Sequence, residues 1–222
     1  MNKYILALLV FGFGIFASTP VANAAPLSLF NTGSTVAQGA TDPNWTLGTN
    51  AGSYGASLMT ASNGTYPLIT NWLQNDATSK WLVPNGTQNN HAAGDYDFLT
   101  SFDLTGFDPA SASVTFRFAV DNSMNGVFLN STSLTIPSGI GFTAFSAPVT
   151  VNNTTNPGVF TGGVNTLRFS VNNAPGASEN PTGLRVEISG TANVAAVVPE
   201  SGAGLLALLA LPLLGAVAVR RK

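Results

Sequence analysis

Three short segments of this chain alternate strictly between apolar and polar side chains. The pattern is clearest over 113–120, where every second residue is Val or Phe and the residues between them include Thr, Arg and Ala. It recurs over 167–171 and over 184–188, where Arg185 and Glu187 share the polar face. Such alternation predicts antiparallel strands with one face toward a core and the other toward solvent.

The segment between Ala25 and Val197 shows no apolar period of 3.6 residues long enough to predict a helix. Eight or more short strands, separated by Gly, Pro and Asn turns, are typical of a β-sandwich. We therefore expect an all-β fold, an antiparallel jelly-roll-like sandwich over residues 25–195. The less regular strand candidates are 45–47, 56–59, 96–104, 126–130 and 142–151.

Charge is scarce in this chain. Charged residues make up 8% of the sequence, against about 25% in an average soluble protein. Residues 25–198 hold four cations and nine acidic residues, so no nucleic acid partner is expected, because phosphates require clustered Lys and Arg. The chain has no cysteine, which excludes disulfides, thiolate catalysis and Cys-ligated zinc.

Residues 1–24 are predicted to form a secretory signal peptide. A Lys near the start, a short apolar run and the small-residue exit Ala22-Asn-Ala24 are typical of one. We expect signal peptidase to cut between Ala24 and Ala25. The alternative is an uncleaved anchor helix, but the run is short for a membrane span and Pro20 follows it.

A second apolar run covers residues 204–219 and ends in Arg220, Arg221 and Lys222. As a helix it would be about 24 Å long, slightly less than the hydrocarbon core of about 30 Å. The three terminal cations should stay in the cytoplasm by the positive-inside rule. We expect a transmembrane helix with a basic cytoplasmic tail at 220–222 and the body outside; a buried core helix is the alternative.

Residues 196–203 are predicted to be a linker between the body and this helix. Proline prevents regular pairing there, and the small residues leave the backbone accessible to a processing enzyme. The linker contains a five-residue motif, made of Val198, Pro199, Glu200, Ser201 and Gly202.

This motif, the apolar helix and the terminal Arg cluster together resemble the PEP-CTERM class of bacterial sorting signals. The motif is closer to the related variant Val-Pro-Asp-Ser-Gly, with Glu200 in place of Asp. The resemblance implies a Gram-negative envelope protein that is held transiently in the inner membrane. An exosortase-like transpeptidase would cleave it near Pro199 and pass it to the cell surface or extracellular matrix. Proteins of this class often accompany exopolysaccharide production.

The body also shows a resemblance. In the segment 119–130, Asn125-Gly126 stands between two apolar stretches and predicts a hairpin turn. Together with three other segments, it resembles the galactose-binding-like jelly-roll sandwich. Those segments are 94–98, 163–169 and 183–186.

Few residues suggest catalysis. His91 is the only histidine and is expected to be a solvated loop residue, and the body has no Gly-x-Ser-x-Gly elbow. Asp95 and Asp97 share one face of a strand, which we interpret as its solvent side. Calcium ligation and acid–base catalysis are the alternatives for this pair.

The spacing of Asp121, Ser123, Asn125 and Gly126 matches positions one, three, five and six of a calcium loop. The twelfth position is Thr132, which cannot supply the bidentate carboxylate. We therefore favour a hairpin turn and predict no cofactor, with calcium as the alternative.

Aromatic side chains that could stack on sugar rings are Trp45, Tyr54 and Tyr66, whereas Trp72 and Trp81 have aliphatic neighbours that place them in the core. We expect a non-catalytic, exported envelope or matrix protein associated with exopolysaccharide. One alternative is a carbohydrate-binding module with a defined sugar site. A second is a secreted glycoside-active hydrolase.

Overall fold

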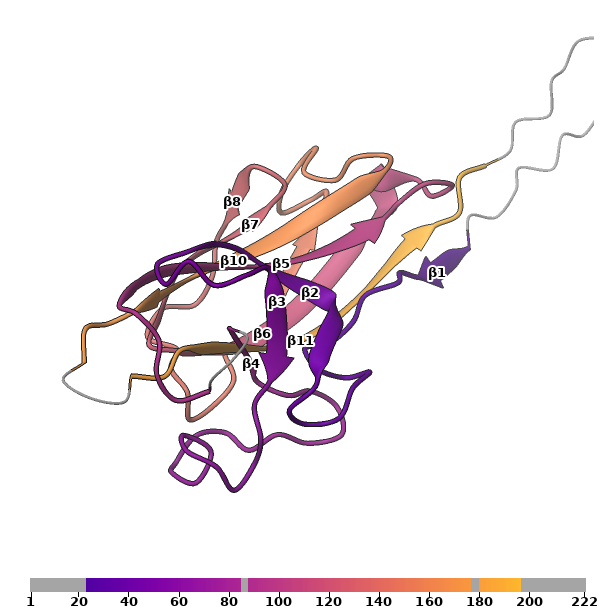
Figure 1. Cartoon of the computed structure of the whole chain (residues 1–222). Coiled ribbons are helices and arrows are strands. Elements are labelled where there is room, and N and C mark those ends of the chain that lie inside the picture. Colours follow the sequence, from indigo (N-terminus) through magenta and orange to yellow (C-terminus); the bar gives the residue numbers. More distant parts are fainter. Residues whose placement is uncertain (1–22, 85–87, 177–179, 197–222) are drawn as a thin grey trace, which may run out of the picture.

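The structure is a computed structural model that describes residues 23–84, 88–176 and 180–196 (Figure 1). These residues form an all-β fold, as predicted, and their only helical element is a 3₁₀ turn at Pro109–Ser111. The strands are β1 (Ala24–Pro26), β2 (Thr41–Asn50), β3 (Ser57–Thr60), β4 (Leu82–Pro84), β5 (Gly94–Asp103), β6 (Ser113–Asp121), β7 (Ser123–Leu129), β8 (Thr132–Leu134), β9 (Val149–Asn152), β10 (Val164–Asn173) and β11 (Gly183–Asn193).

All strand pairs are antiparallel, and the strands form one sheet in the order β8-β7-β10-β5-β2-β3-β4-β11-β6-β9, with β1 added on β11. Strands β10 and β6 are far apart in this order. Nevertheless, the ring of Phe169 on β10 lies 5.4 Å from that of Phe116 and 6.4 Å from that of Phe118, both on β6. The sheet therefore curls until its two halves face each other across one core.

The main core lies between these two halves. On β6, every second side chain from Val114 to Val120 is buried in it, as the alternation predicts. Trp45 on β2 and Tyr96 on β5 are buried in the same cluster. The aromatic packing explains how a body without disulfides is held together, since each buried aromatic removes a large apolar area from water.

A second, smaller core lies on the outer face of β6 and β11. It forms because the loop 61–81 folds over that face and places Trp72 and Trp81 against Ala119. Phe142 and Phe145 also pack on it, so the strand expected over 142–151 is shortened to β9. Ala119 was predicted to lie on the solvent side, and the covering loop is the reason that it does not.

The same loop overturns the prediction that Arg185 faces solvent. The Arg185 side chain is fully buried. Its Nε donates to Ser79 Oγ at 2.8 Å, its Nη1 donates to the carbonyl of Gln74, and its Nη2 lies 2.8 Å from Asp76 Oδ2. Three contacts from one side chain thus fasten the loop 61–81 to β11.

The hairpin predicted at Asn125-Gly126 is also wrong. Both residues lie within β7, where Gly126 pairs with Ser170 and Met124 pairs with Val171, so that Asn125 is the extra residue of a β-bulge. The chain instead turns at Asn122, where it crosses from β6 in one half of the sheet to β7 in the other.

The two described ends of the body lie side by side. Ala24 on β1 pairs with Asn193 at the end of β11, and the backbone N–H of Val194 donates to the carbonyl of Asn23 at 3.3 Å. Both chain ends leave the sheet at this pole (Figure 1). We call it the terminal pole.

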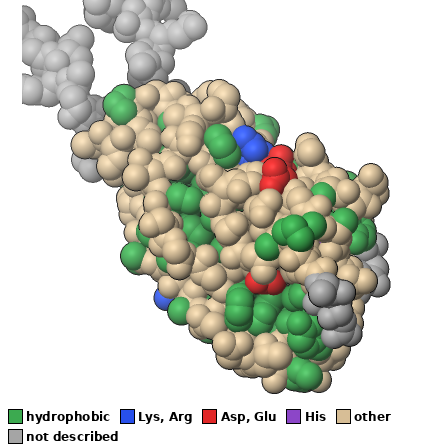
Figure 2. All heavy atoms as spheres, turned by 90° about the vertical axis from the view of Figure 1, so that its left-hand side faces the viewer, with side chains coloured by type: hydrophobic (Ala, Val, Ile, Leu, Met, Phe, Trp, Pro, Cys, Tyr) green, Lys and Arg blue, Asp and Glu red, His purple; other side chains and the backbone are tan. Residues whose placement is uncertain are grey.

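The opposite pole, which we call the loop pole, is formed where β6 ends beside the start of β11: Asp121 pairs there with Gly183. Figure 2 views the molecule from this side and shows a surface with few charged side chains. Hydrophobic side chains gather on its lower half beside an acidic side chain.

Candidate functional site

The predicted sorting elements fall largely outside the part of the chain that the structure describes. Ala22, the motif Val198–Gly202, the helix 204–219 and the cations 220–222 all lie outside it. Within residues 23–84, 88–176 and 180–196, no helix is long and apolar enough to cross a membrane. Ala24 and Ala25 are described: they belong to β1, so the predicted signal cleavage would fall inside this short strand.

Of the three aromatics predicted to contact sugar, Trp45 cannot do so. Its side chain is 1% exposed, and its Nε1 donates to the carbonyl of Phe30 at 3.0 Å. Tyr54 is half-buried against the rings of His91 and Tyr96. Tyr66 is half-buried at the loop pole. The sequence therefore misplaces Trp45, because a Trp next to polar residues does not show which face of its strand it occupies.

His91 is not a solvated loop residue. It is 3% exposed, and its Nδ1 accepts a hydrogen bond from the backbone N–H of Thr182 at 3.2 Å. Its ring centroid lies 5.6 Å from that of Tyr54, edge to face. The loop before β5 packs against residues 180–182, and this contact buries the side chain of His91.

Asp95 and Asp97 lie on the outer face of β5, as predicted. Asp95 is exposed, and its Oδ1 accepts from the side-chain amides of Asn125 and Asn172 at 2.9 and 2.8 Å. These two hydrogen bonds lower the pKa of Asp95. Asp97 forms an ion pair with Arg168 at 3.2 Å. Asp95 and Asp97 thus each interact with different side chains and do not act together as a pair.

The calcium loop, which was the alternative interpretation of the spacing from Asp121 to Gly126, is not formed. Asp121 ends β6, whereas Ser123 and Asn125 belong to β7 in the other half of the sheet. The described residues contain no group of three or more His, Cys, Asp and Glu side chains that could hold a metal ion. Of these residues, only Asp121 remains a candidate site residue, because it lines a hollow at the loop pole.

Asp121 lies at the wall of an open hollow of about 370 Å³ at the loop pole, which we call the Asp121 hollow. The hollow lies between the loop 66–72, Phe142 and residues 180–181, three segments that come from distant parts of the sequence. Its lining combines aromatic rings with side-chain amides around one carboxyl group. The lining residues are Tyr66, Thr70, Asn71, Trp72, Asp121, Asn122, Phe142, Asn180 and Pro181.

One carboxylate oxygen of this lining accepts no hydrogen bond from a described residue. Asp121 Oδ1 accepts from the Asn122 side-chain amide at 3.0 Å, whereas Oδ2 accepts no hydrogen bond from a described residue. Buried polar groups are usually paired, so Asp121 Oδ2 is the atom that a ligand would satisfy.

The carboxyl group of Asp121 is deeply placed for a charged group. Asp121 is 2% exposed. Burial raises the pKa of its carboxyl group to about 7, although the hydrogen bond from Asn122 acts to lower this pKa. A raised pKa follows because a carboxylate loses hydration when it is buried without a cation beside it. Perturbed carboxyl groups in a cavity are typical of functional sites.

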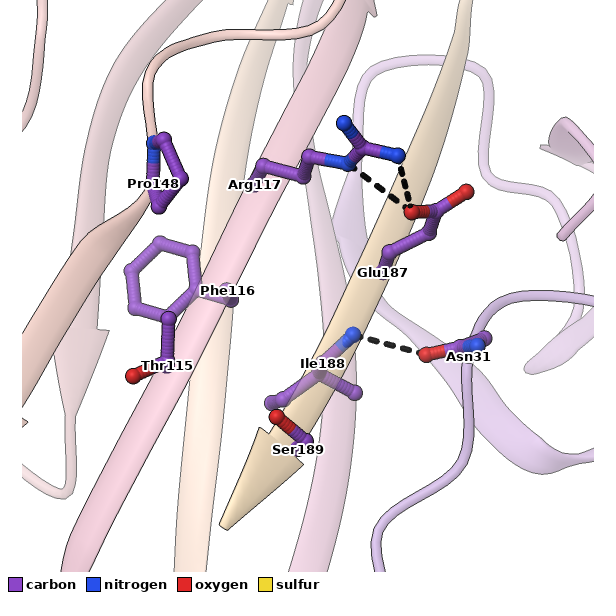
Figure 3. A pocket seen from close by; sticks show the side chains of 8 residues that line it. All are labelled: Asn31, Thr115, Phe116, Arg117, Pro148, Glu187, Ile188 and Ser189. Atoms are coloured by element: carbon purple, nitrogen blue, oxygen red, sulfur yellow. Dashed lines mark hydrogen bonds and ion pairs between the residues drawn. The ribbon is translucent and has the colours of Figure 1, made fainter. Parts of the chain in front are cut away.

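Two other hollows are less suited to a ligand. The first, of about 280 Å³, lies over β6 and β11, where Arg117 Nη2 and Glu187 Oε2 are 2.6 Å apart and neutralise each other (Figure 3). The N–H of Ile188 donates to Asn31 Oδ1 at its edge. The second, of about 320 Å³ beside Phe30, has no charged side chain in its lining.

No protein-family model matches this chain. No curated protein matches it either. The candidate site therefore rests on its own geometry.

Proposed function

We propose that this chain is an exported cell-envelope or extracellular-matrix protein, sorted through its tail by an exosortase-like enzyme. Its body is a non-catalytic scaffold that associates with exopolysaccharide. The observation that carries the proposal is the position of the two ends of the body, which lie side by side at the terminal pole.

This arrangement suits a protein attached through one end. The predicted leader ends at Ala24 and the predicted anchor begins at residue 204, so both would join the body at the terminal pole. Strand β11, with 11 residues, spans about 36 Å at about 3.3 Å per residue. With β11 upright on the membrane, the loop pole would lie about that far from the terminal pole, where it can reach polymers outside the cell.

A non-catalytic role agrees with the way in which the titratable groups are used. Asp97 and Glu187 are each paired with an arginine. The His91 ring packs among tyrosines, and its Nδ1 accepts from a backbone N–H rather than acting on a nucleophile. A general base needs an accessible proton acceptor within reach of substrate, and a histidine 3% exposed does not offer one.

For the fold, we propose the jelly-roll-like sandwich of the galactose-binding type. The support is the single antiparallel sheet, which curls so that β6 and β10 pack face to face. A fold of this kind does not determine a function by itself. It does present loops at one end of a rigid scaffold, where binding residues commonly lie.

A carbohydrate-binding module is the second candidate, and the Asp121 hollow favours it. Sugars are recognised by aromatic rings, which contact their apolar C–H faces, and by amide and carboxylate groups, which bind their hydroxyls. The hollow supplies both kinds of group in one place at the loop pole. Tyr66, predicted from the sequence to contact sugar, lies in its wall.

The sorting proposal is tested by replacing Pro199 and Glu200 with Ala in the full chain and expressing it in a bacterium that processes such tails. We expect the double variant to accumulate unprocessed in the inner membrane, because the cleavage enzyme no longer recognises the linker. Pro175→Ala, at an exposed position of the body, is the matched control and should be processed normally. Normal release of the double variant would overturn the proposal.

A further inference from the structure

We propose that the Asp121 hollow binds an amine-bearing sugar, with the Asp121 carboxylate as the partner of the sugar's ammonium group. The choice of a sugar rests on the proposed association with exopolysaccharide. The requirement for an ammonium group rests on the hollow itself.

The first argument is the missing cation. Arg117, Arg168 and Arg185 each form an ion pair with a different carboxylate, and Asp121 takes part in none of these three ion pairs. The Nζ of Lys80 donates to the carbonyl of Gly33 at 2.7 Å. The cations of the described body are therefore engaged elsewhere, and the charge of Asp121 is left for a ligand to neutralise.

The second argument is the aromatic wall. Tyr66 and Phe142 are half-buried and line the hollow, and Trp72 stacks on Phe142 with centroids 5.6 Å apart and planes at 26°. A cation held within about 6 Å of an aromatic face is attracted by the ring quadrupole. Aromatic faces and a carboxylate together select a positively charged group over a neutral one.

The third argument is that the remaining groups suit hydroxyls. The side-chain amides of Asn71 and Asn180 line the hollow, and each amide carries both a donor and an acceptor. A bare metal ion would leave these groups unused and would require more oxygen ligands than one carboxylate supplies. The volume of about 370 Å³ lies at the small end of ligand pockets, which begin near roughly 300 Å³.

The binding experiment uses the purified full chain in mild detergent near pH 7 and isothermal titration calorimetry. The probes are a tetramer of β-1,4-linked glucosamine and the same tetramer with every amine acetylated, which removes the charge and keeps the sugar ring. We expect the amine tetramer to bind at least about tenfold more tightly, as a charge-assisted hydrogen bond would give.

Asp121→Asn keeps the shape of the side chain and should remove this preference. Asp95→Asn is the matched control, because it makes the same substitution at an exposed carboxyl group outside the hollow; it should change the affinity by less than about twofold. Tyr66→Ala is a second variant at a half-buried position and should weaken the binding of the amine tetramer several-fold. Thermal melting of each variant verifies that it is folded.

Equal affinity for the two tetramers would overturn the inference and indicate a site for neutral sugars. Undiminished binding by Asp121→Asn, or no binding by a chain that melts cooperatively, would overturn it as well. A chain that is sorted normally but binds no amine refutes this inference alone, because processing of the tail is read independently of binding.

Discussion

Asp121→Asn should make the protein more stable at neutral pH and leave its stability nearly unchanged in acid. The native carboxyl group has a pKa of about 7, whereas its ordinary value is 3.8. Between these two values the folded state holds a proton that the unfolded state has released. Stability therefore falls as pH rises through this window, because the unfolded state binds fewer protons.

The magnitude follows from the shift. The difference between about 7 and 3.8 is roughly three pKa units, each equivalent to about 1.36 kcal/mol. The penalty is absent below about pH 4 and reaches about 4 kcal/mol above pH 7 as a ceiling, which any water reaching Oδ2 will reduce. Asparagine resembles the protonated acid in shape and carries no charge, so it should remove the whole penalty.

Urea unfolding of the wild type and the variant, followed by tryptophan fluorescence at several values between about pH 4 and pH 8, measures the difference in free energy of unfolding. Asp95→Asn is the control with the opposite sign: hydrogen bonds from Asn172 and Asn125 lower the pKa of Asp95, so its loss should destabilise the protein only above about pH 4. The reasoning is refuted if Asp121→Asn destabilises the protein at pH 8, or if its effect does not vary with pH.

Three further variants are predicted to change the same free energy of unfolding, measured at neutral pH. Arg185→Gln should lower it by about 3 kcal/mol, because it leaves a buried polar network without its charge; a loss below 1 kcal/mol would show that the loop 61–81 is held by its aromatics alone. Trp45→Ala should lower it by about 3–5 kcal/mol by opening a core cavity, and unchanged stability would contradict its burial. Arg168→Ala should cost at most about 1 kcal/mol, since its ion pair with Asp97 is partly exposed, and a larger loss would mean that its stacking on Phe128 dominates.

The alternation of apolar and polar residues predicts well where the strands lie. It predicts poorly whether the polar face of a strand is exposed to solvent. Alternation over 113–120 correctly shows which side chains of β6 share the main core. It cannot show that a loop some 40 residues earlier covers the other face, and so Ala119 and Arg185 were expected in solvent. Whether a face is covered depends on tertiary structure, which no window of a few residues contains.

The same limit applies to the candidate site. The spacing of Asp121, Ser123 and Asn125 suggests one loop, whereas the chain crosses between the halves of the sheet at Asn122 and separates them. The residues that line the hollow with Asp121 come from the segments 66–72 and 180–181 and from Phe142. Tyr66 could be predicted as an accessible aromatic because a proline turn follows it; the burial of the aspartate could not.

The pairing of β1 with the end of β11 also determines how the body would respond to mechanical load. After the predicted cleavage the body begins at Ala25, so tension between its two ends would act first on the pair of Ala25 with Ala192. It would open the ladder one pair after another instead of shearing all the pairs together. The two residues of β1 that remain, Ala25 and Pro26, would peel away at low force. After that, the load would reach β11, which is held on one side by the long ladder to β6. A short sacrificial strand of this kind would yield first and leave the loop pole folded.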